Sequence, residues 1–270
     1  MKNPFLLLSL LAFFAFACGD STETTSTDAE AEANKEAEVD TPSPSYAISP
    51  FPGATDYPDA TISSFTYEDN AFSFEIPEGT YQLGAQTPDA DARMCANSGK
   101  GQHIHLILNN EPYAAKYEAD FDYPLEDGNY HMLAFLSRSY HQSIKTAAAH
   151  KAGIISVQDG TINGMKEIKD PMVVYSRPKG TYVGKANTEK VLLDFYMLNA
   201  ELGADFKVKV NINGTDAGML DNWQAYSIEG LPMGENTVTL TLVDGAGNTV
   251  EAPHNPVSRK FTLQADPIEQ

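Results

Sequence analysis

Two stretches of this 270-residue chain decide its fold: His103-Ile104-His105-Leu106-Ile107-Leu108-Asn109 and Lys207-Val208-Lys209-Val210-Asn211-Ile212-Asn213. Each is a run of strand-forming residues that ends in Asn. In the second stretch lysines alternate with valines, which is typical of a strand with one face in water and the other in a core. The similarity of the two stretches indicates an internal repeat.

The repeat continues on both sides of these stretches. Upstream, Pro77-Glu78-Gly79-Thr80-Tyr81 matches Pro178-Lys179-Gly180-Thr181-Tyr182, and downstream Asp127–Leu133 matches Met233–Thr239. The three matches follow the same order, with an offset that drifts only from 101 to 106 residues. Two copies of one unit therefore follow each other along the chain.

Each copy consists of short strand-like runs separated by turn residues. In the second copy the predicted strands are Lys190–Leu198, Phe206–Ile212, Gln224–Ile228, Asn236–Val243 and Arg259–Leu263. Asn213-Gly214 and Asp244–Gly247 have the composition of tight turns. This pattern predicts an all-β protein of two tandem antiparallel sandwiches, immunoglobulin-like or fibronectin-III-like, over residues 56–168 and 169–265. We expect the only tryptophan, Trp223, to pack in the second core.

One segment departs from the strand pattern. Residues Ser139 to Lys151 contain Ala147-Ala148-Ala149 and few β-branched residues. Alanine, glutamine and lysine favour helix, and Ser137 or Ser139 can cap one. The segment therefore predicts a short helical insertion in the first sandwich, before a last strand at Gly153–Val157.

The beginning of the chain resembles a bacterial lipoprotein signal. An uncharged stretch from Phe5 to Ala17 follows Lys2 and ends at Ala15-Phe16-Ala17-Cys18-Gly19. It has the length of a signal-peptide core and is too short to span a bilayer as a helix. We expect residues 1–17 to be a signal peptide and Cys18 to carry a lipid that anchors the protein to a membrane. A secretory signal with an incidental cysteine is the alternative.

Residues 18–55 have the composition of a disordered tether. Residues 19–40 are mostly Ser, Thr, Ala and acids with one base, Lys35, and prolines follow. Such a segment buries too little apolar surface to offset its ordering entropy. An acidic run directly after the lipidated cysteine resembles the surface-export signal of Bacteroidota lipoproteins. This predicts an outer-membrane lipoprotein displayed on the cell surface, with a periplasm-facing position as the alternative.

The charge and cysteine content exclude some partners. The chain has 18 Lys and Arg against 37 Asp and Glu, a formal net charge of −19. A field of this sign repels nucleic acids and anionic lipid head groups. If Cys18 is lipidated, Cys95 has no partner for a disulfide, and we expect it to be a small buried apolar residue.

A first candidate site is a histidine cluster. Four of the six histidines, His103, His105, His131 and His141, lie in the middle of the first copy. His103 and His105 are two residues apart on a strand, so both side chains project from one face and can reach one ion. The sequence predicts a zinc or copper site on His103, His105 and His131, with His141 as a further candidate. The alternative is that these histidines face solvent without a ligand.

A second candidate site is a basic patch. No acidic residue occurs between Asp127 and Asp159, or from Ala92 to Asn110. If these windows meet in space, their bases form a positive patch that suits a carboxylate or phosphate. The candidate ligand-binding residues are His103, His105, His131, Arg138, His141 and Lys145.

Catalytic motifs are absent from the sequence. It contains no Gly-x-Ser-x-Gly, His-Glu-x-x-His, Walker or dinucleotide-binding pattern. Ser137, Ser139 and His141 are too close in sequence to predict a triad. We therefore expect a protein that is not an enzyme and needs no cofactor unless zinc or copper binds.

Three segments resemble a family of Bacteroidota lipoproteins whose members are often named phosphopeptide-binding protein. They are Gly101–Asn109, Ala134–Lys145 with its Ser-Arg-Ser-Tyr-His motif, and Tyr175–Gly184. The resemblance spans most of residues 70–265, implies a binding protein and supplies no established catalytic residues. The chain lacks the residue pattern of forkhead-associated phosphopeptide domains.

Together these features favour a membrane-anchored module that binds an anionic ligand or an acidic or phosphorylated peptide through its first sandwich. A metal-binding lipoprotein, with or without hydrolytic activity, is the second hypothesis. A purely structural or adhesive module that binds a protein partner is the third. The oligomeric state stays open.

Overall fold

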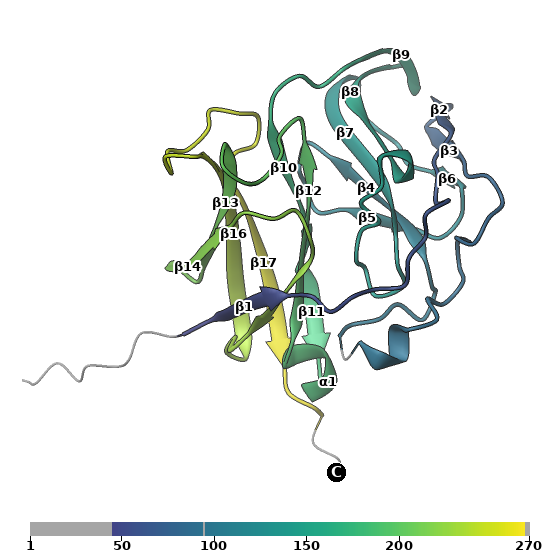
Figure 1. Cartoon of the computed structure of the whole chain (residues 1–270). Helices are drawn as coiled ribbons and strands as arrows, with labels where there is room; N and C mark the ends of the chain where they lie inside the picture. The colour runs from purple at the N-terminus through teal and green to yellow at the C-terminus, as the bar shows by residue number, and fades with distance from the viewer. Residues whose placement is uncertain (1–44, 94, 268–270) are drawn as a thin grey trace, which may run out of the picture. The chain divides into compact units, whose positions relative to one another are not determined.

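Strands account for nearly all regular structure in the computed structural model, which describes residues 45–93 and 95–267 (Figure 1). By their contacts, the described residues form one compact unit. The predicted signal peptide, the lipidation at Cys18 and most of the predicted tether lie outside the described residues. Among the residues described, no helix is long and apolar enough to cross a membrane.

The first sandwich consists of a three-stranded and a five-stranded sheet. The smaller sheet has the order β2-β3-β6, with β2 at Ser64–Glu68, β3 at Ala71–Glu75 and β6 at Asp120–Asp122. The larger has the order β5-β4-β7-β8-β9, with bounds Ala114–Lys116, His103–Leu108, Gly128–Ser137, His150–Gln158 and Thr161–Lys166. Alternate residues of β4, including Ile104 and Leu106, pack with Phe72 and Phe74 in the core between these sheets.

The second sandwich repeats this plan. One sheet has the order β1-β15-β12-β10, with bounds Ala47–Pro50, Tyr226–Glu229, Val191–Leu198 and Met172–Arg177. The other has the order β11-β17-β16-β13-β14, with bounds Gly180–Val183, Val257–Gln264, Gly234–Asp244, Phe206–Ile212 and Thr215–Leu220. Val208 and Val210 of β13 point into the core between these two sheets. The predicted fold class, two tandem antiparallel sandwiches, is confirmed, with one parallel pair, β11 and β17, in the second sandwich.

The two matched stretches occupy equivalent places. β4 lies between β5 and β7, and β13 lies between β14 and β16. Each ends in an Asn with positive φ that exchanges two hydrogen bonds with the neighbouring strand. The amide of His131 donates to Asn109 Oδ1 at 2.9 Å, and the amide of Thr237 donates to Asn213 Oδ1 at 2.7 Å. In return the Asn109 amide donates to the His131 carbonyl and the Asn213 amide to the Thr237 carbonyl.

Two expectations need correction. Within the expected tether of residues 18–55, residues 47–50 form β1, which pairs with β15 of the second sandwich from Ala47↔Glu229 to Pro50↔Tyr226. This edge of β15 can add a strand, so the backbone there gains partners that the composition does not reveal. The expected helix at Ser139–Lys151 is reduced to one 3₁₀ turn at Ala147–Ala149, because β8 already begins at His150. The other helical turns described are η1 (Ala90–Ala92) and α1 (Lys185–Thr188).

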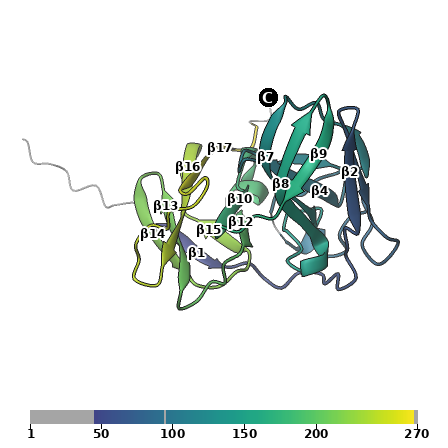
Figure 2. The same ribbon diagram turned by 90° about the horizontal axis from the view of Figure 1, so that it is seen from above.

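The two sandwiches share a third apolar cluster, which positions the site. The face of β4 and β7 that points away from their own core contributes Ile107, Leu133 and Phe135. The corresponding outer face of β10 and β12 contributes Val174 and Tyr196. Figure 2 shows β10 and β12 on the side of the second sandwich nearest to the first. Both faces of the first sandwich's larger sheet are therefore buried around β4, whose six residues are all buried. Polar residues on its outer face must find partners inside this interface.

Candidate functional site

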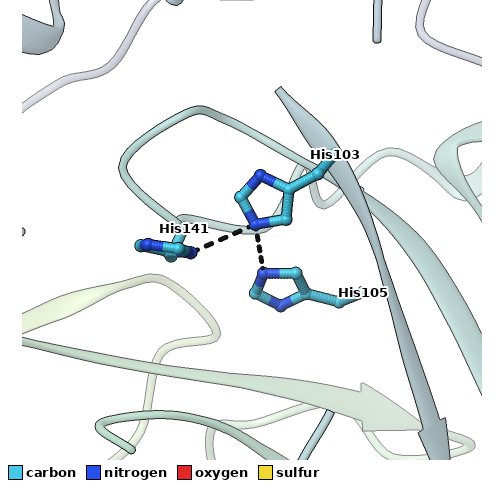
Figure 3. A group of neighbouring side chains, drawn as sticks. All are labelled: His103, His105 and His141. Carbon is cyan, nitrogen blue, oxygen red and sulfur yellow. Dashed lines mark hydrogen bonds between the residues drawn. The ribbon is translucent and has the colours of Figure 1, made fainter. Parts of the chain in front are cut away.

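Three histidines converge at the edge of this interface (Figure 3). His103 and His105 project from β4 on the face opposite Ile104 and Leu106, and both side chains are fully buried. His141 comes from the turn that follows β7, where its φ of 69° places it in the left-handed region. This turn returns to β7 through a bridge between Ser137 and Ser143, which directs the imidazole of His141 back over β4.

The ring nitrogens of this cluster, His103–His105–His141, face one another. His103 Nε2 lies 2.9 Å from His105 Nε2 and 3.1 Å from His141 Nδ1. One ring nitrogen from each of the three residues lies within 4.8 Å of the others. Two imidazoles bound to one tetrahedral zinc ion at 2.0–2.1 Å place their nitrogens about 3.3 Å apart. The shorter separations in the cluster are therefore within a few tenths of an ångström of those around a metal ion.

Outer hydrogen bonds hold two of the rings. His103 Nδ1 lies 2.8 Å from the carbonyl oxygen of Gly101, so Nδ1 carries the proton and donates it, and Nε2 presents its lone pair to the cluster. His105 Nδ1 lies 3.2 Å from Oγ of Ser176 on β10. Partners of this kind orient histidines that bind metals. The second sandwich therefore helps to hold the ring of a histidine on the first.

Burial keeps these imidazoles neutral. It lowers the pKa of His103 to about 4, an effect that the positive charge of Arg177 reinforces. Burial also lowers the pKa of His105 and His141 far below the usual range; for His105 the neighbouring His103 adds to the shift, and for His141 Arg177 does. A neutral imidazole is the form that binds a metal ion.

Aromatic rings surround the cluster. Tyr113 stacks on His105 with ring centroids 3.6 Å apart and an angle of 8° between the planes. The Tyr117 ring lies 4.9 Å from that of His103. Lys179 covers the other side of Tyr113, with Nζ 3.9 Å from the ring centroid, and donates to the Tyr113 carbonyl. These rings exclude water from the two strand histidines and leave His141, which is only partly buried, as the member closest to solvent.

The predicted metal ligand His131 lies outside the cluster. In the register of β4 and β7, His103 lies opposite Ser137 and His105 opposite Phe135, so His131 is at the far end of the pairing. Its ring instead contacts that of His254, with centroids 5.2 Å apart. Of the predicted trio, the structure brings His103 and His105 together, and His141 instead of His131 completes the group. Because apolar and polar residues do not alternate cleanly around His131, the sequence pattern does not show in which register this strand pairs with its neighbour.

The predicted cations Arg138 and Lys145 are engaged elsewhere. The guanidinium of Arg138 donates to the carbonyl oxygen of Thr55 through Nε at 2.8 Å and Nη2 at 2.6 Å, and Nη1 donates to that of Ser143. Lys145 Nζ donates to Asp194 Oδ1 at 3.0 Å, to Ser143 Oγ and to the Phe195 carbonyl. Both side chains hold segments of the protein together, so neither is available to an anion.

The sequence did not reveal the contribution of the second sandwich. Ser176 and Arg177, at the end of β10, lie beside the histidines although more than 70 residues separate Ser176 from His105 along the chain. The only hint was the stretch Tyr175–Gly184, noted for its resemblance. Cys95 is buried as expected, and burial raises the pKa of its thiol to about 11. Trp223 packs against both the second core and the interface, and its Nε1 donates to the Phe195 carbonyl.

Comparisons with known proteins concern the type of fold. No protein-family model matches the chain, and no curated protein matches it. Fibronectin-III-like modules of Clostridium thermocellum CbhA align over 36% of this chain and 100% of theirs, with 14% identity and a TM-score of 0.29. The central fibronectin-III array of RIM-binding protein aligns over 80% of this chain and 73% of its own, with 11% identity and a TM-score of 0.27. Domains 4 and 5 of the S-layer protein SbsC align over 82% of this chain and 98% of their own, with 8% identity and a TM-score of 0.22. The assignment of two sandwiches rests on the strand pairings described above.

Proposed function

We propose that this protein is a membrane-anchored, non-enzymatic binding module that holds zinc or copper on His103, His105 and His141. The observation that carries the proposal is the convergence of three neutral imidazoles, two of them with their outer nitrogens already bonded. Imidazole nitrogen suits both metals, and three protein ligands leave a coordination position open for a further ligand.

The burial of the histidines supports this function over a solvated role. A fully buried polar group without a ligand or partner is costly, and the lone pair of His103 Nε2 faces two further ring nitrogens. One lone pair accepts one strong hydrogen bond, so one of these two contacts is weak without an ion. A metal ion at the centre would satisfy all three nitrogens at once.

The anion and phosphopeptide hypothesis has less support. Two of the six residues proposed for it, Arg138 and Lys145, each donate three hydrogen bonds to acceptors of the protein, and His131 lies apart from the rest. The lipid anchor at Cys18 and display on the outer membrane remain part of the proposal and rest on the amino-terminal sequence alone.

The test is the metal content of the full chain, purified in mild detergent without a polyhistidine tag. We expect stoichiometric zinc or copper after incubation with the ion and dialysis, and little in His141→Asn, since Asn tolerates the left-handed backbone of this position. Zinc at a hundred times its dissociation constant should stabilise the wild type by about 2.7 kcal/mol.

The matched control is His131→Asn, which removes a histidine from the neighbouring strand outside the cluster. It should bind metal like the wild type. Wild-type protein that is folded, as judged by circular dichroism, and still takes up neither ion would contradict the proposed function.

A further inference from the structure

Arg177 is a buried cation beside the histidine cluster that the metal site alone does not explain. It is the last residue of β10, and the residue is 7% exposed. The pairing of β10 with β12 shifts between Tyr175 and Arg177, a bulge that redirects the side chains at the end of the strand. Ser176 thereby contacts His105, and Arg177 lines a narrow pocket together with His141, Tyr140 and Tyr182.

The hydrogen bonds of Arg177 are incomplete. Nη1 donates to Tyr182 Oη at 2.8 Å and weakly to the Lys179 carbonyl at 3.4 Å. Nε is buried and has no partner among the described residues. No carboxylate pairs with this guanidinium in the described part of the chain, although a buried charge is normally paired. The guanidinium therefore has one buried N–H group without an acceptor and no counter-charge among the described residues.

The charges around the histidine cluster also favour an anion at the site. Apart from the histidines themselves, the charged groups that lower the pKa of the three histidines are Arg177 and Lys179, and no carboxylate is among them. A divalent ion on three neutral imidazoles keeps its full charge of about +2, next to two more positive charges. Such an excess in a buried interface is costly unless an anion shares the site.

We propose that Arg177 completes the cluster as an anion subsite, so that the site takes a metal ion together with a small anion. The anion fills the open coordination position of the metal and accepts charge-assisted hydrogen bonds from the guanidinium. Lys179, held over Tyr113, adds positive potential without contacting the anion. The pocket holds no free space the size of a water molecule, so its lining side chains must shift to admit a ligand, which restricts the ligand to a small inorganic anion or a single carboxylate group. This inference rests on the proposed metal site.

The test uses the full chain loaded with Co²⁺, a spectroscopic substitute for zinc, and titrates azide, chloride and acetate separately. The visible absorption of bound Co²⁺ should change as an anion enters the coordination sphere. In Arg177→Met, we expect unchanged Co²⁺ content and an anion affinity lower by about tenfold or more, within the usual range for linked ligands. Lys100→Met removes an exposed positive charge over Tyr117 and is the control, with wild-type anion affinity expected.

A second measurement keeps the inference testable if Arg177→Met does not fold. By linkage, an anion that binds with the metal raises metal affinity, so wild-type Zn²⁺ affinity should be about tenfold higher in chloride than in perchlorate. A spectral response to azide but not to acetate would identify the ligand as an inorganic anion, and a response to acetate would identify it as a carboxylate. Either response supports the subsite if it is lost in Arg177→Met. Bound Co²⁺ whose spectrum no anion changes, or equal responses in wild type and Arg177→Met, would overturn it. Absence of any bound metal would instead reject the metal site itself.

Discussion

The same strand of the repeat has opposite surroundings in the two sandwiches. The outer face of β4 carries His103, His105 and Ile107, all buried against the second sandwich. The outer face of β13 carries Lys207, Lys209 and Asn211, all partly exposed. The inner faces are alike, with Ile104 and Leu106 in one core and Val208 and Val210 in the other. The core of each sandwich thus requires apolar residues on the inner face of the strand. Whether the second sandwich or solvent covers the outer face decides which residues suit it.

Each of these two outer faces has an ion pair nearby, and the two pairs differ in burial as the two faces do. Lys145 and Asp194 join the turn that carries His141 to β12, with side chains 18% and 0% exposed. Lys209 on β13 pairs with Asp216 on β14, with side chains 41% and 58% exposed. A buried pair is sensitive to the loss of one member, whereas an exposed pair contributes little. The comparison can therefore be tested by breaking each pair.

The largest effect is expected for Asp194→Ala. The substitution leaves the ammonium of Lys145 in the interface without its counter-charge and should cost about 3–5 kcal/mol of unfolding free energy, measured by urea titration. The double variant Lys145→Met with Asp194→Leu removes both charges and should regain most of this loss. A single variant as stable as the wild type would show that the interface is not closed around this pair.

An intermediate effect is expected from pH, measured with a chelator present to remove metal ions. The pKa of His103 is about 4 when folded against 6.5 for the unfolded reference, so the unfolded chain binds the proton more readily. The neutral imidazole therefore contributes full stability above about pH 6.5, and this contribution is lost as the pH falls from 6.5 towards 4. At pH 5 the loss for His103 alone should be on the order of 2 kcal/mol relative to pH 8.

The matched variants for this pH effect are His103→Gln and His131→Gln. The first should reduce the difference in urea midpoint between pH 8 and pH 5, and the second should leave it as in the wild type. Equal pH dependence in all three proteins would mean that His103 is accessible to protons in the folded state.

The smallest effect is expected for Lys209→Met on the exposed face of β13. Solvent screens its pairing with Asp216, so the urea midpoint should be indistinguishable from that of the wild type at moderate salt. A clear loss of stability would mean that this face is covered in solution, for instance by a partner, and would remove the contrast with β4.

Much of the fold was predictable because it depends on local patterns. The predicted strand Phe206–Ile212 matches β13 residue for residue, since alternation and the following Asn-Gly turn are local signals. Residues 47–50 and Ser139–Lys151 were misassigned for the opposite reason. The strand β1 exists only because β15 offers an edge, and the alanine run yields to the pairing of β8 with β7.

The sequence by itself determined that two related units of short strands follow each other along the chain, and that His103 and His105 share one face of a strand. These conclusions follow from the internal repeat and from the two-residue period of a strand, and both can be read from the sequence without knowledge of the tertiary contacts. Only the tertiary structure decided that the second sandwich buries this face, that His141 rather than His131 joins it, and that Arg138 and Lys145 are already occupied. Register, burial and the partners of each polar group arise when distant segments meet, so no local pattern contains them.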